Sequence, residues 1–134
     1  MKECAIILFA HGARDPEWAQ PFRRIQRSVA RKCPDAAVEL AFLESMEPAL
    51  GETIDRLAKA GRTRITVAPL FMAQGGHLKQ DVPRILDAIR AEHPGVDIDL
   101  LPAIGEVDAI LDAISAWVAG TGARAARRHA RGSK

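Results

Sequence analysis

The chain has 134 residues, 48% of them apolar, and its 19 basic and 17 acidic residues give a net charge of +2. This length fits one domain, and the ordinary glycine, proline and apolar content excludes collagen-like, low-complexity and wholly disordered chains. The longest apolar run, residues 5–10, is far shorter than the roughly 20 residues that cross a membrane. We therefore expect neither a membrane span nor a secretory signal.

Four strands and four helices are predicted to alternate along the chain. Runs rich in Ile, Val, Leu and Phe predict strands at residues 4–10, 37–43, 64–71 and 96–101. Apolar residues at helical spacing predict a helix after each strand, in stripes that begin at Trp18, Leu50, Val82 and Val107. The order predicts an α/β fold, with an open, mainly parallel four-stranded sheet flanked by helices on both faces.

The basic residues are concentrated at the C-terminal end of the sequence. Residues 120–134 carry five basic residues and no acid, which leaves a charge of −3 on residues 1–119. Nucleic-acid-binding domains carry their basic residues on a folded face, so we expect no nucleic-acid partner. We assign residues 1–119 to a single domain and predict that 120–134 form a disordered basic tail, because this Gly/Ala/Arg segment cannot build a core.

The two cysteines indicate the compartment. Cys4 and Cys33 form no Cys-x-x-Cys pair and no disulfide framework. Such a chain is typical of a reducing environment, so we expect a cytoplasmic protein.

Chemistry-bearing side chains follow the first three predicted strands. These are His11, Glu44 and His77 respectively. In an open parallel sheet, ligands bind beyond the carboxyl ends of the strands, so the three are expected at one edge. Two imidazoles and a carboxylate suit a divalent ion such as Co²⁺, Fe²⁺, Ni²⁺ or Zn²⁺. Taken singly, each has a plainer interpretation: a histidine after a strand is more often a hydrogen-bonding residue, and Glu44 could be a solvated strand end.

Phosphate-binding sites are poorly supported. Neither the P-loop pattern nor the Gly-x-Gly-x-x-Gly pattern follows the first strand. His11 and Arg14 are partly similar to the motif of histidine phosphatases, but Ala10 stands where that motif has an arginine. His93 and His129 are interpreted as structural or incidental.

Two long motifs resemble one enzyme family. LFAHGARDPEWAQPF (residues 8–22) and PLFMAQGGHLKQDVP (residues 69–83), with AFLES (residues 41–45) between them, resemble the small class II sirohydrochlorin chelatases of cobalamin and sirohaem synthesis. The resemblance implies a lyase that inserts a divalent metal substrate, Co²⁺ or else Fe²⁺ or Ni²⁺, into sirohydrochlorin without an organic cofactor. It also implies that His11 and His77 are the active-site histidines and that Glu44 binds the metal.

The resemblance also indicates where the substrate binds. Arg14 and Lys79, on the two histidine loops, are predicted to bind the substrate carboxylates, and Ser45 is a third candidate. His11 is the expected proton acceptor, because an imidazole with a pKa of about 6.5 accepts protons at neutral pH. Met46, Leu70, Phe71 and Met72 could offer apolar surface to the macrocycle, although such residues usually belong to the core.

Two other functions and one assembly state remain open from the sequence. The same residues could serve a non-catalytic metal-binding or delivery protein, or the sheet could carry a small hydrolase. The larger chelatases that the chain resembles have two α/β halves facing each other, whereas this chain has one. We therefore expect a homodimer, with Trp117 and Val118 of the last helix near the contact and with Ile110 and Ile114 packed on the chain's own sheet.

Overall fold

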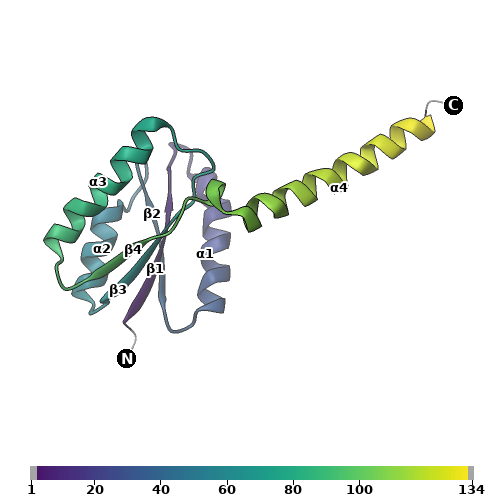
Figure 1. Ribbon diagram of the computed structural model, residues 1–134. Helices are drawn as coiled ribbons and strands as arrows, with labels where there is room; N and C mark the ends of the chain where they lie inside the picture. Colours follow the sequence, from purple (N-terminus) through teal and green to yellow (C-terminus); the bar gives the residue numbers. More distant parts are fainter. Residues whose placement is uncertain (1–2, 133–134) are drawn as a thin grey trace.

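A computed structural model describes residues 3–132 as a four-stranded sheet with helices on both faces (Figure 1). The strands are β1 (Cys4–Ala10), β2 (Ala37–Phe42), β3 (Arg64–Pro69) and β4 (Asp97–Leu100). They pair in the order β2-β1-β3-β4, and all pairs are parallel. The helices are α1 (Gln20–Lys32), α2 (Leu50–Lys59), α3 (Gly76–Glu92) and α4 (Asp108–Gly132). The predicted fold class is confirmed, and each predicted strand lies within two residues of the observed bounds.

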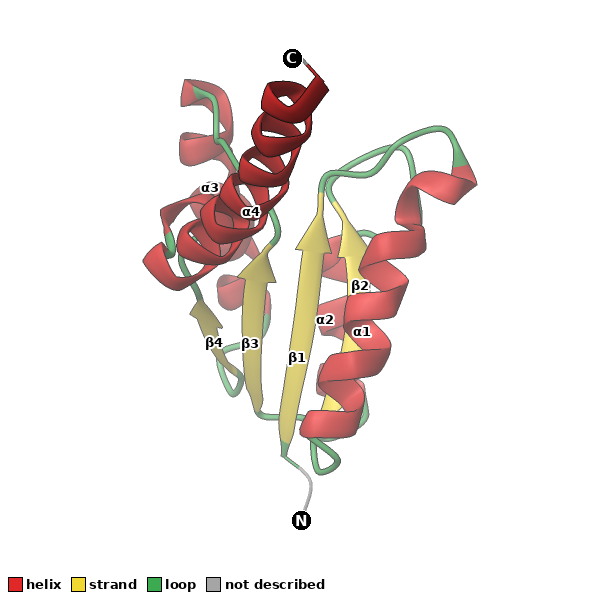
Figure 2. Cartoon of the chain, turned by 90° about the vertical axis from the view of Figure 1, so that its right-hand side faces the viewer, coloured by secondary structure: helices red, strands yellow, loops and turns green. Residues whose placement is uncertain are grey.

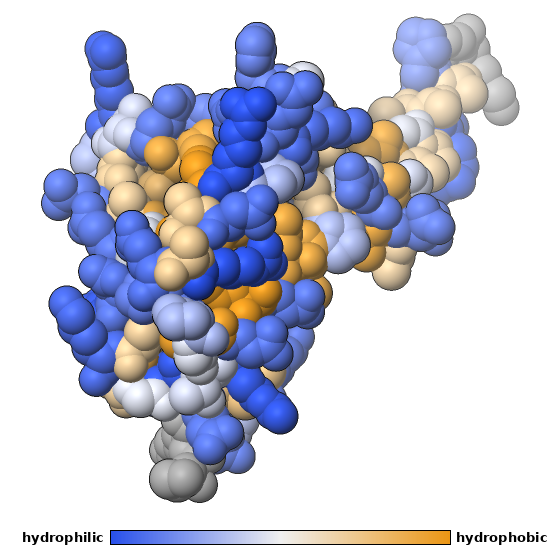
Figure 3. All heavy atoms as spheres, turned by 60° about the vertical axis from the view of Figure 1, so that its left-hand side comes forward, coloured by the Kyte–Doolittle hydropathy of each residue, from blue (hydrophilic) through white to orange (hydrophobic). Residues whose placement is uncertain are grey.

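The main core lies between the sheet and the pair α2 and α3. Ile7 and Phe9 of β1 are almost fully buried there and share one cluster with Ile54 of α2 and Leu86 of α3. This explains the nearly continuous apolar sequence of β1, because a central parallel strand is covered on both sides. On the outer surface of α2 and α3, hydrophilic side chains surround smaller apolar areas (Figure 3).

A smaller core lies under α1 on the other face of the sheet. Leu8, Leu40 and Phe42 are buried there, and Trp18 packs on Phe22 with ring centroids 4.6 Å apart. Trp18 belongs to a short 3₁₀ turn, η1 (Pro16–Ala19), which Asp15 caps by accepting a hydrogen bond from the Glu17 N–H. The η1 turn leads the chain from the end of β1 into α1.

The half of this face over β3 and β4 is left partly open. Figure 2 looks onto it and shows α1 beside β2. The register pairs Ile6 of β1 with Thr66 of β3, and Thr66 with Asp99 of β4, so these residues share the α1 side. Thr66 and Ala68 are partly exposed, Asp99 is exposed, and Leu101 just beyond β4 is 41% exposed.

The C-terminal helix corrects two predictions. Residues 120–132 belong to α4 and are helical rather than disordered; the last two residues of the predicted tail lie outside the described residues. Alanine and arginine are strong helix formers, which accounts for a helix that continues through Gly120 and Gly122. The helix also projects away from the body instead of covering the sheet (Figure 1), and its main contacts are with the short turn η2 (Ile104–Glu106).

The apolar stripe of α4 is therefore solvent-exposed in the single chain. No residue of α4 is buried, and Ile114, Trp117 and Val118 are 39%, 70% and 54% exposed. The expectation that Ile114 packs on its own sheet is wrong, because α4 leaves the body before that residue. Ile110 is only partly buried near η2. No helix among residues 3–132 is both long and apolar enough to span a membrane.

Candidate functional site

The loops after β1 and β2 bring His11 and Glu44 into contact. The parallel register aligns Ala10 with Phe42, so the residues that follow the two strands start side by side. The Leu43 N–H donates to the Ala10 carbonyl (2.9 Å) and the Glu44 N–H donates to the His11 carbonyl (3.1 Å). Beyond this short ladder, His11 Nε2 lies 2.8 Å from Glu44 Oε1. Both side chains are at least half exposed, so an incoming ion could reach both.

Gly12 makes this contact possible. Its φ is +93°, and a Cβ atom at this position would lie 1.8 Å from the Glu44 carbonyl oxygen. Glycine is required both for the left-handed backbone and for the close approach of the two loops. The contact with the Glu44 backbone is visible only in the structure.

The chain reverses direction directly after Glu44. The Met46 N–H donates to the Glu44 carbonyl (2.8 Å), and Ser45 between them has a φ of +64°. A hydrogen bond from residue i+2 to residue i with a positive central φ describes a γ-turn of the strained type. Ser45 therefore has a backbone role beside Glu44, which the sequence did not indicate, because serine is not a residue that favours positive φ.

His77 does not join the other two predicted ligands in this conformation. It lies in the first turn of α3 and is exposed. Within residues 3–132, no group of three metal-binding side chains with mutual ligand distances under 4.8 Å contains His11, Glu44 and His77 together. Because His11 and Glu44 are in contact, His77 lies farther than 4.8 Å from at least one of them. The structure thus assembles two of the three predicted ligands, and residues 70–75 separate β3 from the third.

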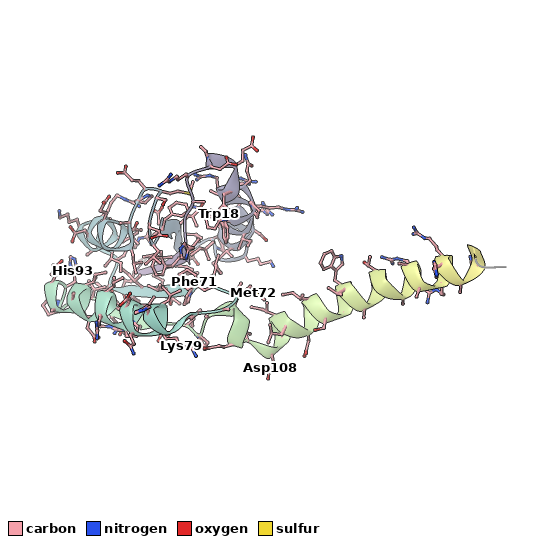
Figure 4. The ribbon with its side chains drawn as sticks, turned by 90° about the horizontal axis from the view of Figure 1, so that it is seen from above. Trp18, Phe71, Met72, Lys79, His93 and Asp108 are labelled. Atoms are coloured by element: carbon pink, nitrogen blue, oxygen red, sulfur yellow. The ribbon has the colours of Figure 1, made fainter. Side chains whose placement is uncertain are left out.

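Phe71 packs beside His11, and Gly105 makes a close backbone contact with the segment that holds Phe71. Phe71 is 5% exposed and presents its ring edge-on to His11 at a centroid distance of 6.3 Å. The Gly105 N–H donates to the Phe71 carbonyl, and a Cβ on Gly105 would lie 1.5 Å from the Met72 carbonyl oxygen. Phe71 is therefore core, whereas Met72 is 54% exposed and remains available to a ligand (Figure 4). Met46 and Leu70 are partly buried.

The two predicted cationic residues are exposed. Neither Arg14 nor Lys79 forms an ion pair with any residue between 3 and 132. Lys79 borders a hollow of about 320 Å³ beside the end of β4, and neither His11 nor Glu44 lines that hollow. In a single chain, the His11–Glu44 pair therefore lies on an open edge of the sheet rather than in an enclosed cavity.

Comparisons with known proteins identify relatives of this chain. The model of the CbiX family matches residues 5–121. A curated relative, the sirohydrochlorin cobaltochelatase of Methanosarcina barkeri (strain Fusaro), is 36% identical over 85 residues. That match covers 63% of this chain and 65% of the relative, so the chain spans less than two thirds of the length of that protein.

Solved structures with the same fold include shorter and longer proteins. A CbiX protein of cobalamin (vitamin B12) biosynthesis from Marinobacter aquaeolei VT8 matches with a TM-score of 0.78 and 35% identity, over 90% of this chain and 98% of that one. The sirohydrochlorin chelatase SirB from Bacillus subtilis subspecies spizizenii, solved in complex with cobalt, matches with a TM-score of 0.63 and 27% identity. The second match covers 76% of this chain but 44% of SirB.

Proposed function

The chain belongs to the CbiX family, and on that premise we propose that it is a lyase that inserts a divalent metal ion into sirohydrochlorin. The observation that carries the proposal is the contact of His11 with Glu44 at the carboxyl edge of the sheet. The relatives that are named sirohydrochlorin chelatases, including one solved with cobalt, support the same reaction.

In the proposed reaction the metal ion is a substrate that the protein holds briefly. His11 and Glu44 supply one nitrogen and one oxygen ligand, and His77 supplies a second nitrogen when the loop before α3 moves toward them. Three such ligands leave positions on the ion for water and then for the pyrrole nitrogens. A closed thiolate cage would retain the metal, and an open set of imidazole and carboxylate ligands can release it.

Metal insertion also releases two protons from the pyrrole N–H groups. Once the ion passes to the macrocycle, the lone pair of His11 and the carboxylate of Glu44 become free, and each can take one proton. The two residues lie 2.8 Å apart, so a proton that reaches the imidazole can continue to the carboxylate and then to solvent. The same two side chains therefore first hold the metal and then accept the protons that it displaces.

Cations and an apolar side chain would orient the macrocycle. We assign Arg14 and Lys79 to the substrate carboxylates, because both are exposed and have no acidic partner among residues 3–132. The Ser45 hydroxyl, next to Glu44, is the third polar candidate. Met72 offers exposed apolar surface at the same edge. Cobalt is the proposed physiological metal, as in the relative named a sirohydrochlorin cobaltochelatase. The cytoplasm is the proposed location, because Cys4 and Cys33 are free thiols.

The working unit is proposed to be a homodimer. A single chain leaves the His11–Glu44 edge open, whereas ligand sites generally bury most of a ligand's surface. The chain spans 44% of SirB, so two copies approach the length of that chelatase. A two-fold pair of chains would supply the second wall.

We propose that two unpartnered surfaces of the chain meet in such a pair. The exposed stripe of α4 holds Ile114, Trp117 and Val118, and the open half-face over β3 and β4 holds Ala68 and Leu101. Their net charges are also opposite. The distal part of α4, residues 121–132, has four arginines without an acid, and the open half-face has Asp97 and Asp99 against Arg64. We assign α4 of one copy to this half-face of the other.

Mixing the protein with sirohydrochlorin and Co²⁺ tests the function. The absorption spectrum of the tetrapyrrole should change faster than in the spontaneous reaction, and His11→Ala should remove most of that acceleration. His129→Ala on the distal part of α4 is the matched control and should retain it. Tight Co²⁺ binding without acceleration would instead indicate a metal-delivery protein, and phosphate release from a generic ester would indicate a hydrolase.

A further inference from the structure

A second group of metal-ligating side chains lies where α3 ends. His93 Nε2 is 2.6 Å from Asp55 Oδ1 of α2, and ligand atoms of Asp55, Glu92 and His93 all lie within 4.8 Å of one another. We propose that these three residues form a second binding site for a borderline divalent ion such as Co²⁺, Ni²⁺ or Zn²⁺. This inference does not depend on the proposed chelatase reaction.

The second site is remote from the His11–Glu44 pair. Figure 4 shows His93 at the far end of α3 from Lys79. The 17 residues of α3 span about 25 Å at 1.5 Å per residue. An ion at His93 therefore cannot share ligands with an ion at the carboxyl edge of the sheet.

The backbone fixes the position of His93. Its N–H donates to the carbonyls of Ile89 and Arg90 at the end of α3, and its own carbonyl accepts from the Val96 N–H (3.0 Å). The side chain of His93 is 16% exposed, and that of Asp55 is 48% exposed. The imidazole is thus held in place while one side of the group stays open to solvent, as an exchangeable metal site requires.

The charges of the group favour a cation. The two carboxylates bring negative charge beside the imidazole, which a divalent ion would neutralise, and the C-terminal end of α3 adds negative potential. The nitrogen ligand favours a borderline metal over Mg²⁺ or Ca²⁺, which prefer oxygen ligands. On binding, His93 Nε2 donates its lone pair to the ion while the ring keeps one proton on Nδ1, and Asp55 and Glu92 bind as carboxylates.

The position of Glu92 favours a metal site over a purely structural hydrogen bond between α2 and the end of α3. The His93–Asp55 hydrogen bond alone would hold the two helices together without Glu92. Glu92 is exposed and has no hydrogen bond or ion pair with the other residues of the range 3–132. An oxygen of its carboxylate nevertheless lies within 4.8 Å of ligand atoms of both His93 and Asp55, and a bound cation would offset its repulsion with Asp55.

Titrating the double variant His11→Ala/His77→Ala with Co²⁺ by calorimetry tests the proposal, because this background removes both proposed histidine ligands of the first site. One ion should still bind per chain, and adding Glu92→Gln should weaken that binding about tenfold or more. Adding Glu17→Gln is the matched control and should leave binding unchanged, because Glu17 is exposed on η1, which packs on the face of the sheet opposite to α3.

Thermal unfolding supplies a second readout. In excess Co²⁺ the double variant should unfold at a higher temperature than in chelator, since an ion that binds only the folded chain stabilises it. At the same Co²⁺ concentration Glu92→Gln should make this increase smaller, in step with its weaker binding, without changing the unfolding temperature in chelator. The proposal is overturned if the double variant binds no Co²⁺, or if Glu92→Gln and Glu17→Gln bind it equally. Full metal insertion by Glu92→Gln alone would show that the first site is independent.

Discussion

Gly12 is the residue on which the geometry of the His11–Glu44 pair depends most directly. We predict that Gly12→Ala destabilises the chain by about 1–3 kcal/mol and weakens Co²⁺ binding at the edge of the sheet. The new Cβ would meet the Glu44 carbonyl at 1.8 Å, so the two loops must separate. Chemical denaturation measures the free energy of unfolding, and calorimetry measures the metal affinity.

Gly61→Ala is the matched control for that substitution. Gly61 has a similar φ of +88°, but no atom lies within 4 Å of the position of its Cβ. The backbone strain is therefore common to the two variants, and only Gly12→Ala separates the loops. Equal Co²⁺ affinities for both variants would show that the close approach at Gly12 does not position the metal ligands.

Glu44 allows the charge at the site to be tested separately from its shape. Glu44→Gln keeps the size of the side chain and its hydrogen-bonding capacity but removes the negative charge. Because the side chain is 61% exposed, the free energy of unfolding should change by less than about 0.5 kcal/mol. Co²⁺ affinity should fall about tenfold or more, and metal insertion should slow in parallel. With Glu17→Gln as the control, unchanged affinity and rate in Glu44→Gln would make Glu44 a solvated strand end.

The individual site residues show what a sequence can predict. His11 and Glu44 could be expected at one edge from sequence because His11 follows β1 directly and Glu44 follows β2 after one residue, and β1 and β2 end side by side in the parallel register. His77 follows β3 only after residues 70–75, and the conformation of that segment is not determined by the strand register. The positive φ of Ser45 was also not predictable, because it arises from the sharp reversal after Glu44 rather than from a residue preference.

Among the secondary-structure elements, α4 shows what the periodicity of apolar residues can and cannot predict. The spacing of Ile110, Ile114 and Trp117 correctly predicted an apolar helical face. Periodicity defines which residues share a face, but it does not identify the surface on which that face packs. The helix likewise continues through residues 120–132, where the Gly/Ala/Arg composition had suggested disorder. The high helix propensity of alanine and arginine accounts for the difference.

The distal part of α4 should be dispensable for folding. Every described residue after Gly120 is exposed, so truncation after Gly120 removes no core packing. The truncated chain should keep its unfolding temperature and its metal insertion while losing helical signal in circular dichroism. Exposed ion pairs contribute about 0–1 kcal/mol each, so loss of the arginines should weaken a dimer only modestly. A large loss of activity at saturating protein would mean that these arginines collect the anionic substrate.

At the scale of the whole molecule, the single chain has too few surfaces to enclose a flat macrocycle. The edge that carries His11 and Glu44 is open, one half-face of the sheet lacks a covering helix, and one helix lacks a surface to cover. Exposed apolar side chains that line up on one face usually mark an interaction surface. In the proposed homodimer a second copy would meet all three needs at once, because its projecting helix would cover the open half-face.

The proposed homodimer can be tested at Trp117, the most exposed large apolar residue of the α4 stripe. We predict that light scattering at micromolar concentration gives the mass of a dimer, and that Trp117→Asp shifts it toward the monomer, because burying a charge in an apolar contact is costly. Ala116→Asp adds the same charge on the opposite face of α4 and should leave the dimer intact. Circular dichroism should show a folded body in both variants, since α4 has no buried residues. A fully active wild-type monomer would refute the dimer, as would equal masses for the two variants.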